Sequence, residues 1–327
     1  MRTMSNWLAV VAVMYCVSAH AAKPVKVVGG LNNPCGVAIQ PETGVVFVAD
    51  SGAGRVVQVV DGKAVDVITG FPKDVYGKGP NYDIGPLGLT FLDRDTLVVG
   101  GGGNIDDKEL LRVYKVDVKG VLKAEDMEAS FSLTANETLK AEGNFHGVTS
   151  TDSAVYVTCN GDDTKGWVAK ATVKDGKVTK FERFIATKEA TGVDAPVAAT
   201  MSPRGQLVIG QMGEITVPND GLLTFYNAKN GKMLRNVEVG LSDITAVAFS
   251  PKKKAKIYAL DFSWFDTAEG GLFQLIAKKG DEKLMIESKK LCGLDKPTAM
   301  AFGDDGALYI TVIGDGDGQL LKIDPGL

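Results

Sequence analysis

Short runs of β-forming residues alternate with small or polar residues along most of the chain. One such run recurs six times, and each copy ends in a small or polar break. The six copies are 46–50, 97–101, 155–159, 207–211, 257–261 and 308–312. A second pattern, a small residue followed by an apolar one, precedes each copy by about ten residues. It starts at Gly36, Gly88, Gly147, Ala198, Ala246 and Ala299. The spacing predicts six copies of one structural unit.

Two more strands are predicted within each unit, except that the last unit has only one. In the first unit they are 55–59 and 64–68, separated by the turn 61–63. Asp-Gly and Asn-Gly turns between apolar runs indicate hairpins, because these turns need positive φ. Four short antiparallel strands in about fifty residues are typical of a β-propeller blade. The small residues suit the innermost strands, which crowd the central axis.

The two ends of the chain complete this pattern. Only four residues follow Ile323, so the sixth unit has no fourth strand of its own. Residues 25–28 form a β-type segment that belongs to no unit. Pairing the two would close the ring and remove an exposed strand edge. The sequence therefore predicts an all-β protein, a six-bladed propeller of four-stranded antiparallel blades closed by the N-terminal strand, as one domain over residues 22–327.

The first unit resembles an NHL repeat, in residues 33–38 and 46–56, and residues 294–299 resemble it next best. The other units keep the strand pattern without the Asp and Arg. The resemblance implies a six-bladed propeller, in which Asp50 and Arg55 form a structural pair. Wider relatives include gluconolactonase-type and strictosidine-synthase-like propellers, although a fold does not define a function.

The first 21 residues have the order of a secretory signal. Arg2 precedes the apolar run 7–14, and Ala19-His20-Ala21 supplies a small-x-small cleavage site. We expect cleavage after Ala21 and a secreted or periplasmic protein. The apolar run is too short for a permanent span, and no later segment reaches that length without charges. We therefore expect no membrane span.

The net charge of the chain argues against one class of binding partner. The formal net charge is −4, so the chain lacks the basic surface that a phosphate backbone requires, and we expect no nucleic acid partner. The expected partner is a small molecule, a glycan or a protein at the channel mouth, and we expect a monomer.

Polar residues gather in the loops at one end of the predicted channel. The loops leading into the inner strands and those after the second strands face the same side. The candidate ligand-binding residues there are Asn33, Asp50, Asn144, Asp194, Asp243, Asp261 and Asp295. Carboxylates on one face predict an acidic mouth, suited to calcium or to a cationic ligand. The alternative is turn chemistry, because Asp and Asn bond nearby backbone amides in tight turns.

His146 is the only histidine left after signal removal, at the head of an inner strand. The equivalent residues of the other units are Cys35, Leu87, Val197, Thr245 and Thr298, and all six should ring the channel. His146 is therefore a candidate ligand-binding residue, with a packing role as the alternative. Cys35 could bridge to Cys292 in an oxidising compartment, or both could be free.

Two functions remain open. The first is a binding module that presents an acidic channel mouth, with no catalytic residue. The alternative is a metal-dependent lactone or ester hydrolase resembling gluconolactonase. That resemblance implies one divalent ion, possible ligands being Asn144, Asp194 and Asp243, but Asn33 stands where the family has a glutamate. No cofactor is otherwise expected. We favour binding over catalysis.

Overall fold

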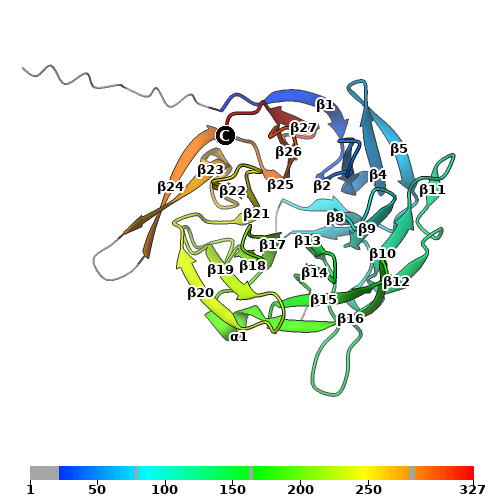
Figure 1. Ribbon diagram of the computed structural model, residues 1–327, viewed down its shortest axis with the longest axis horizontal. Coiled ribbons are helices and arrows are strands. Elements are labelled where there is room, and N and C mark those ends of the chain that lie inside the picture. The colour runs from blue at the N-terminus through cyan, green and yellow to red at the C-terminus, as the bar shows by residue number, and fades with distance from the viewer. Residues whose placement is uncertain (1–21, 78–79, 162–164, 280–283) are drawn as a thin grey trace, which may run out of the picture.

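The computed structural model describes residues 22–77, 80–161, 165–279 and 284–327. The predicted signal peptide, residues 1–21, lies outside the described residues. Six antiparallel β-sheets surround a central axis, and their strands follow one another around the ring in chain order (Figure 1). The six-bladed β-propeller that the sequence predicted is confirmed.

Blades 1 and 2 come first in the chain. Blade 1 contains β2 (Pro34–Ile39), β3 (Val46–Asp50), β4 (Arg55–Val60) and β5 (Lys63–Thr69). Blade 2 contains β8 (Pro86–Phe91), β9 (Thr96–Gly101), β10 (Leu111–Lys115) and β12 (Ala129–Phe131). A short strand from the blade 2 segment, β11 (Leu122–Lys123), pairs in parallel with β5, so blade 1 has five strands. This pairing ties the outer edges of the two blades together.

Blades 3 to 5 are four-stranded meanders. Blade 3 contains β13 (Phe145–Thr151), β14 (Ala154–Cys159), β15 (Trp167–Lys174) and β16 (Lys177–Ala186). Blade 4 contains β17 (Pro196–Met201), β18 (Gln206–Gln211), β19 (Leu222–Asn227) and β20 (Met233–Glu238). Blade 5 contains β21 (Ile244–Phe249), β22 (Ile257–Asp261), β23 (Gly271–Lys279) and β24 (Leu284–Gly293).

Blade 6 takes strands from both ends of the chain. Its inner strands are β25 (Pro297–Phe302), β26 (Leu308–Val312) and β27 (Gly318–Ile323). The outermost strand is β1 (Val25–Leu31), which pairs antiparallel with β27 from Val25 opposite Lys322 to Leu31 opposite Gly318. Val28 and Leu31 are buried in the apolar cluster between blades 6 and 1.

The remaining elements are short. One α-helix, α1 (Thr187–Thr191), and three 3-10 helices lie in loops; the latter are η1 (Ser51–Ala53), η2 (Asp106–Lys108) and η3 (Thr267–Glu269). A two-stranded hairpin of β6 (Asp74–Tyr76) and β7 (Tyr82–Ile84) is inserted between blades 1 and 2. No helix among the described residues is long and apolar enough to cross a membrane.

Backbone crowding at the axis explains the small residues of the inner strands. A Cβ atom added to Gly36 would lie 2.0 Å from the carbonyl oxygen of Leu87 in the next blade. At Gly88 it would lie 2.2 Å from the carbonyl oxygen of His146. Real Cβ atoms do not approach oxygen so closely, so glycine is required at these two positions.

Large rings fill most spaces between blades. At the second residue of the recurring run, which forms the second strand of each blade, the side chain packs toward the next blade, and four blades carry an aromatic residue there. These are Phe47, Tyr156, Tyr258 and Tyr309. Blades 2 and 4 carry Val98 and Val208 instead. The two valines leave more space to be filled by other side chains.

Candidate functional site

Six side chains ring the channel because each inner strand contains a bulge. In β2 the pairing with β3 moves from Pro34–Asp50 to Gly36–Ala49, so Cys35 has no residue opposite it. The same irregularity occurs in the inner strands of the other five blades. The predicted ring is confirmed for Cys35, His146, Val197, Thr245 and Thr298, which line the channel cavities. Leu87 is fully buried and packs with Cys35 and Ile84.

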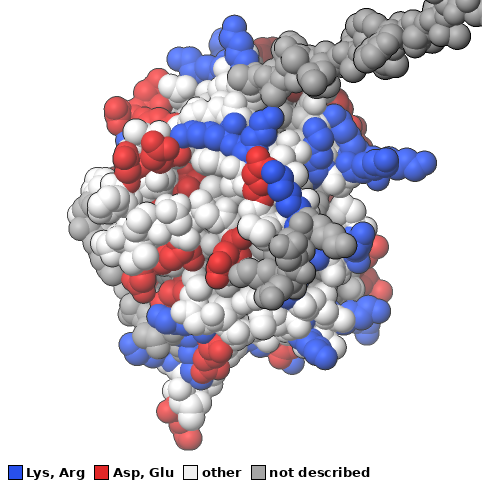
Figure 2. Space-filling model, turned by 90° about the vertical axis from the view of Figure 1, so that its left-hand side faces the viewer, with Lys and Arg blue, Asp and Glu red and all other residues white. Residues whose placement is uncertain are grey.

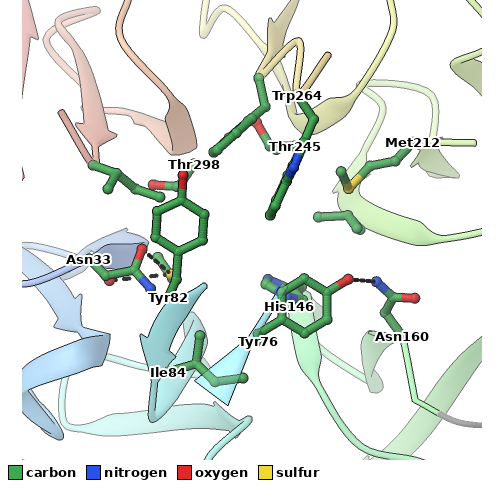
Figure 3. Close-up of a pocket in the computed structure, with 14 residues that line it drawn as sticks. Asn33, Tyr76, Tyr82, Ile84, His146, Asn160, Met212, Thr245, Trp264 and Thr298 are labelled. Carbon is green, nitrogen blue, oxygen red and sulfur yellow. Dashed lines mark hydrogen bonds between the residues drawn. The ribbon is translucent and has the colours of Figure 1, made fainter. Parts of the chain in front are cut away.

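The hairpin β6–β7 brings two tyrosines to the mouth of this channel. The Tyr76 ring meets the His146 ring edge-on, with 6.3 Å between centroids. The Tyr82 ring meets the Trp264 ring edge-on at 5.6 Å, and Trp264 is stacked on Phe262 at 4.9 Å. Figure 3 shows Tyr76, Tyr82, His146 and Trp264 around a common space. The cavity there measures about 60 Å³ and has no carboxylate in its lining.

A larger cavity of about 300 Å³ adjoins the first and shares Tyr76, Asn160 and Trp264 with it. Its lining also contains two carboxylates, Asp194 and Glu214. Asn160 Nδ2 donates a hydrogen bond of 3.0 Å to the Tyr76 hydroxyl, which fixes that ring at the boundary of the two cavities. Trp264 Nε1 has no hydrogen-bond partner among the described residues. The larger cavity thus combines aromatic side chains, two carboxylates and an amide.

His146 belongs to the smaller cavity and is partly buried. Desolvation lowers the pKa of its imidazole to about 4, so the ring is neutral near pH 7. A neutral imidazole can both donate and accept a hydrogen bond. The predicted place of His146 at the channel is therefore confirmed, and its part in ligand binding stays a prediction.

Asp194 lies in the larger cavity and is held in place from two sides. Its Oδ2 accepts a hydrogen bond of 2.5 Å from Lys188 Nζ, and its Oδ1 accepts one of 2.8 Å from the backbone N–H of Ala195. The carboxylate raises the pKa of Lys188 through this hydrogen bond. The ion pair balances the charge of Asp194 and leaves the carboxylate oriented toward the cavity.

Asp243 lies beside the site and is almost completely buried. Its Oδ2 accepts a hydrogen bond from the backbone N–H of Trp264, whereas Oδ1 has no partner among the described residues. Burial raises the pKa of this carboxyl to about 7, and the nearby carboxylates of Asp261 and Asp220 add to the shift. Asp243 is therefore close to half-ionised near neutral pH.

Asn33 and Asn144 each lie directly before an inner strand, and the backbone conformation there explains why asparagine occupies both positions. Their φ angles are 48° and 49°, in the left-handed region that asparagine tolerates better than most residues. Asn33 Nδ2 donates to the carbonyl oxygen of Asp83, and Asn144 Nδ2 donates to that of Asn160. Of the two, Asn33 lines the channel cavity.

Asp50 and Asp261 are buried at equivalent positions, at the ends of β3 and β22. Asp50 pairs with Arg55 at 2.7 Å, as the NHL resemblance implied, and accepts from the Asn32 N–H. Asp261 accepts from the backbone N–H groups of Ser242, Asp243 and Ser263. Neither carboxylate lines the two cavities at the mouth. Both hold the loop that leads into the inner strand.

The other predicted residues are spread around the mouth. Asp295 is exposed and pairs with Lys296 at 3.3 Å. Of the proposed metal ligands, Asp194 lines the larger cavity, whereas Asn144 and Asp243 line neither cavity. Within the described ranges, no three His, Cys, Asp or Glu side chains are grouped as a metal site. Cys35, Cys159 and Cys292 are free thiols.

Sequence reasoning missed the residues that define the two cavities. Tyr76 and Tyr82 come from an insertion that has no counterpart in the other units, and Trp264 and Asn160 lie in loops after second strands. Aromatic residues in the predicted loops could have indicated these cavities, because large rings outside the strand pattern are not needed for blade packing. The cavities at the channel mouth are lined mainly by aromatic and apolar residues, with two carboxylates in the larger one, and the acidic mouth stays a prediction.

No family model matches the chain, and no curated protein matches it in sequence. Several solved structures share its fold. One from Thermus thermophilus, assigned as an oxidoreductase (glucose dehydrogenase), is 17% identical, with a TM-score of 0.60 over 92% of this chain and 99% of that one. The soluble aldose sugar dehydrogenase of Escherichia coli is 13% identical, with a TM-score of 0.60 over 93% and 100%. A protein assigned as a gluconolactonase is 13% identical, with a TM-score of 0.58 over 93% and 92%.

At these identities the likeness establishes the fold. The protein is a six-bladed β-propeller whose channel mouth is covered by an aromatic hairpin. It shares this fold with propellers assigned as a gluconolactonase and as sugar dehydrogenases, which are among the relatives that the sequence led us to expect.

Proposed function

We propose that the protein is a binding module whose channel mouth binds a small hydroxyl-rich ring compound, such as a sugar or its lactone. The observation that carries this proposal is the cavity of about 300 Å³, in which Tyr76 and Trp264 lie with Asp194, Glu214 and Asn160. Its size is at the lower end of the range of small-molecule sites. Concave sites with aromatic walls and a few polar groups favour such ligands.

The chemistry of the lining supports this ligand class. Aromatic faces pack against the C–H groups of a sugar ring, while carboxylates and an amide bond its hydroxyls. The structural neighbours assigned as sugar dehydrogenases and a gluconolactonase are named for carbohydrate substrates, which adds support.

The test is a thermal-shift titration with D-glucose, D-galactose, D-xylose and D-glucono-1,5-lactone. We expect at least one of the four to raise the melting temperature of the native protein. Trp264→Ala should lower the affinity for that ligand by about tenfold or more, because it removes an aromatic wall of the cavity.

Phe265→Ala is the matched control, because Phe265 is the next residue, is 71% exposed and lines neither cavity. It should bind as the native protein does. The proposal is wrong if none of the four compounds stabilises the protein, or if both variants lose stabilisation equally.

A calcium-dependent lactone hydrolase is the second candidate. It is favoured by the unpartnered Oδ1 of Asp243, because a buried carboxylate oxygen is the kind of ligand that calcium takes. We expect calcium to raise the melting temperature of the native protein but not that of Asp243→Asn. Stabilisation without lactone turnover would favour the binding module, and the absence of stabilisation would exclude this candidate.

We also propose that the protein is exported, with cleavage after Ala21 and a secreted or periplasmic location. The charged, apolar and small-x-small segments of residues 1–21 support this proposal. Mass spectrometry of protein from cells tests it, and a mature chain that begins at Ala22 is the expected result.

A further inference from the structure

A second concave site lies between blades 4 and 5, away from the channel. It is a groove of about 540 Å³, formed by β17–β20 with their turns on one side and by β21–β24 on the other. Its apolar lining is Leu223, Phe225, Val237, Phe249, Ala255, Ile257, Leu275, Ala277 and Ile286. The groove adjoins a second hollow of about 430 Å³, which shares Arg235, Val237 and Ile286 with it.

The groove exists because blade 4 has a small side chain at a position where most blades have an aromatic ring. The second strand of blade 4 carries Val208 where blades 1, 3, 5 and 6 carry a ring that packs against the next blade. Blade 2 also carries a valine, but Phe145 and Phe181 pack edge-on in the neighbouring blade and fill that interface. Among the described residues, no ring pair joins blades 4 and 5. The outer part of this interface is therefore open.

The groove is positively charged along its margin. Four exposed cationic side chains line it, Arg204, Arg235, Lys253 and Lys254, and no Asp or Glu does. None of the four forms an ion pair with a described residue. The Arg235 guanidinium lies over the Phe225 ring at 4.2 Å from its centroid. Figure 2 faces this side of the molecule, on which uncharged surface is interspersed with Lys, Arg, Asp and Glu.

We propose that this groove binds a long-chain carboxylate, with its hydrocarbon chain on the apolar floor and its head group at the four cations. The floor offers nine apolar side chains and few polar ones, which suits a hydrocarbon chain. An acidic peptide fits less well, because its backbone N–H and C=O groups would need polar partners that this floor lacks. The cations supply charge complementarity to an anionic head group.

Isothermal titration with dodecanoate tests the proposal. We expect binding that strengthens about fourfold with each methylene from octanoate to dodecanoate, as expected for buried CH₂ groups. Dodecanol should bind at least tenfold more weakly, because it lacks the charge. Reversing three cations in Arg204→Glu/Lys253→Glu/Lys254→Glu should lower the affinity for dodecanoate by about tenfold or more. All three are exposed, so the melting temperature should be unchanged.

Two further variants locate the binding. Lys119→Glu/Lys229→Glu/Lys232→Glu changes the net charge equally at exposed positions outside the groove and should bind as the native protein does. Ala277→Trp places a ring over the exposed floor and should abolish binding. The proposal is overturned if dodecanoate does not bind, if affinity is independent of chain length, if the two charge variants behave alike, or if only a Glu-rich peptide binds.

Discussion

Asp243 was selected from the sequence as a charged residue, but burial in the folded protein favours the neutral form of its carboxyl. Sequence reasoning selected it as an oxygen ligand in a loop at the mouth. The structure buries it against the backbone of Trp264 and leaves one of its oxygens without a described partner. The same burial raises the pKa of its carboxyl to about 7. Its ionisation therefore opposes folding.

This shift predicts a pH-dependent stability. Between about pH 4 and pH 7 the carboxyl is ionised in the unfolded chain but still protonated in the folded one, so the free energy of unfolding falls as the pH rises. Asp243→Asn keeps the shape and cannot ionise. Relative to this variant, the free energy of unfolding of the native protein should fall by on the order of 2–4 kcal/mol between about pH 4 and pH 7, and it should not fall further above pH 7.

Urea denaturation of both proteins at a series of pH values measures this difference, because groups common to both cancel. Parallel pH profiles for the native protein and Asp243→Asn would show that the Asp243 carboxyl is ionised in the folded state and would contradict its burial as described.

At the scale of elements, β1 joins the first residues of the domain to its last blade. The strand pairs with β27, and Val28 packs into the cluster between blades 6 and 1. Its position could be predicted because the last unit lacks a fourth strand and the segment 25–28 lacks a unit. The hairpin β6–β7 could not be predicted in the same way, since it repeats nothing and is held by contacts with distant residues such as His146 and Trp264.

Deleting residues 22–29 should therefore lower the melting temperature by about 10 °C or more, because it exposes the edge of β27 and part of the core. Two single substitutions in β1 measure how much the packing of its buried side chain contributes to stability. Val28→Ala should cost about 1–3 kcal/mol of unfolding free energy, because Val28 is 5% exposed. Val25→Ala, at a position that is 55% exposed, should cost less than about 0.5 kcal/mol. A deletion variant that melts like the native protein would refute the stabilising role of β1.

At the scale of the whole molecule, the sequence predicted the ring far better than the site. Six repeats of one strand pattern define the blades, and the glycines mark where adjacent inner strands approach each other. The polar residues of the mouth were harder to interpret, because the same Asp and Asn types serve turns. Asn33 and Asn144 adopt positive φ, and Asp50 and Asp261 bind backbone amides. The cavity walls come from loops and an insertion, whose positions depend on tertiary contacts.

The central claim is that the channel mouth is a small-molecule site bounded by Tyr76 and Trp264. A crystal structure of the native protein, soaked in whichever of the four carbohydrate probes stabilises it most, tests this claim directly. We predict one ligand ring between these two aromatic side chains, with Asp194 or Glu214 accepting a hydrogen bond from a ligand hydroxyl. A probe bound only elsewhere on the protein, or an unchanged cavity at saturating probe concentration, would contradict it.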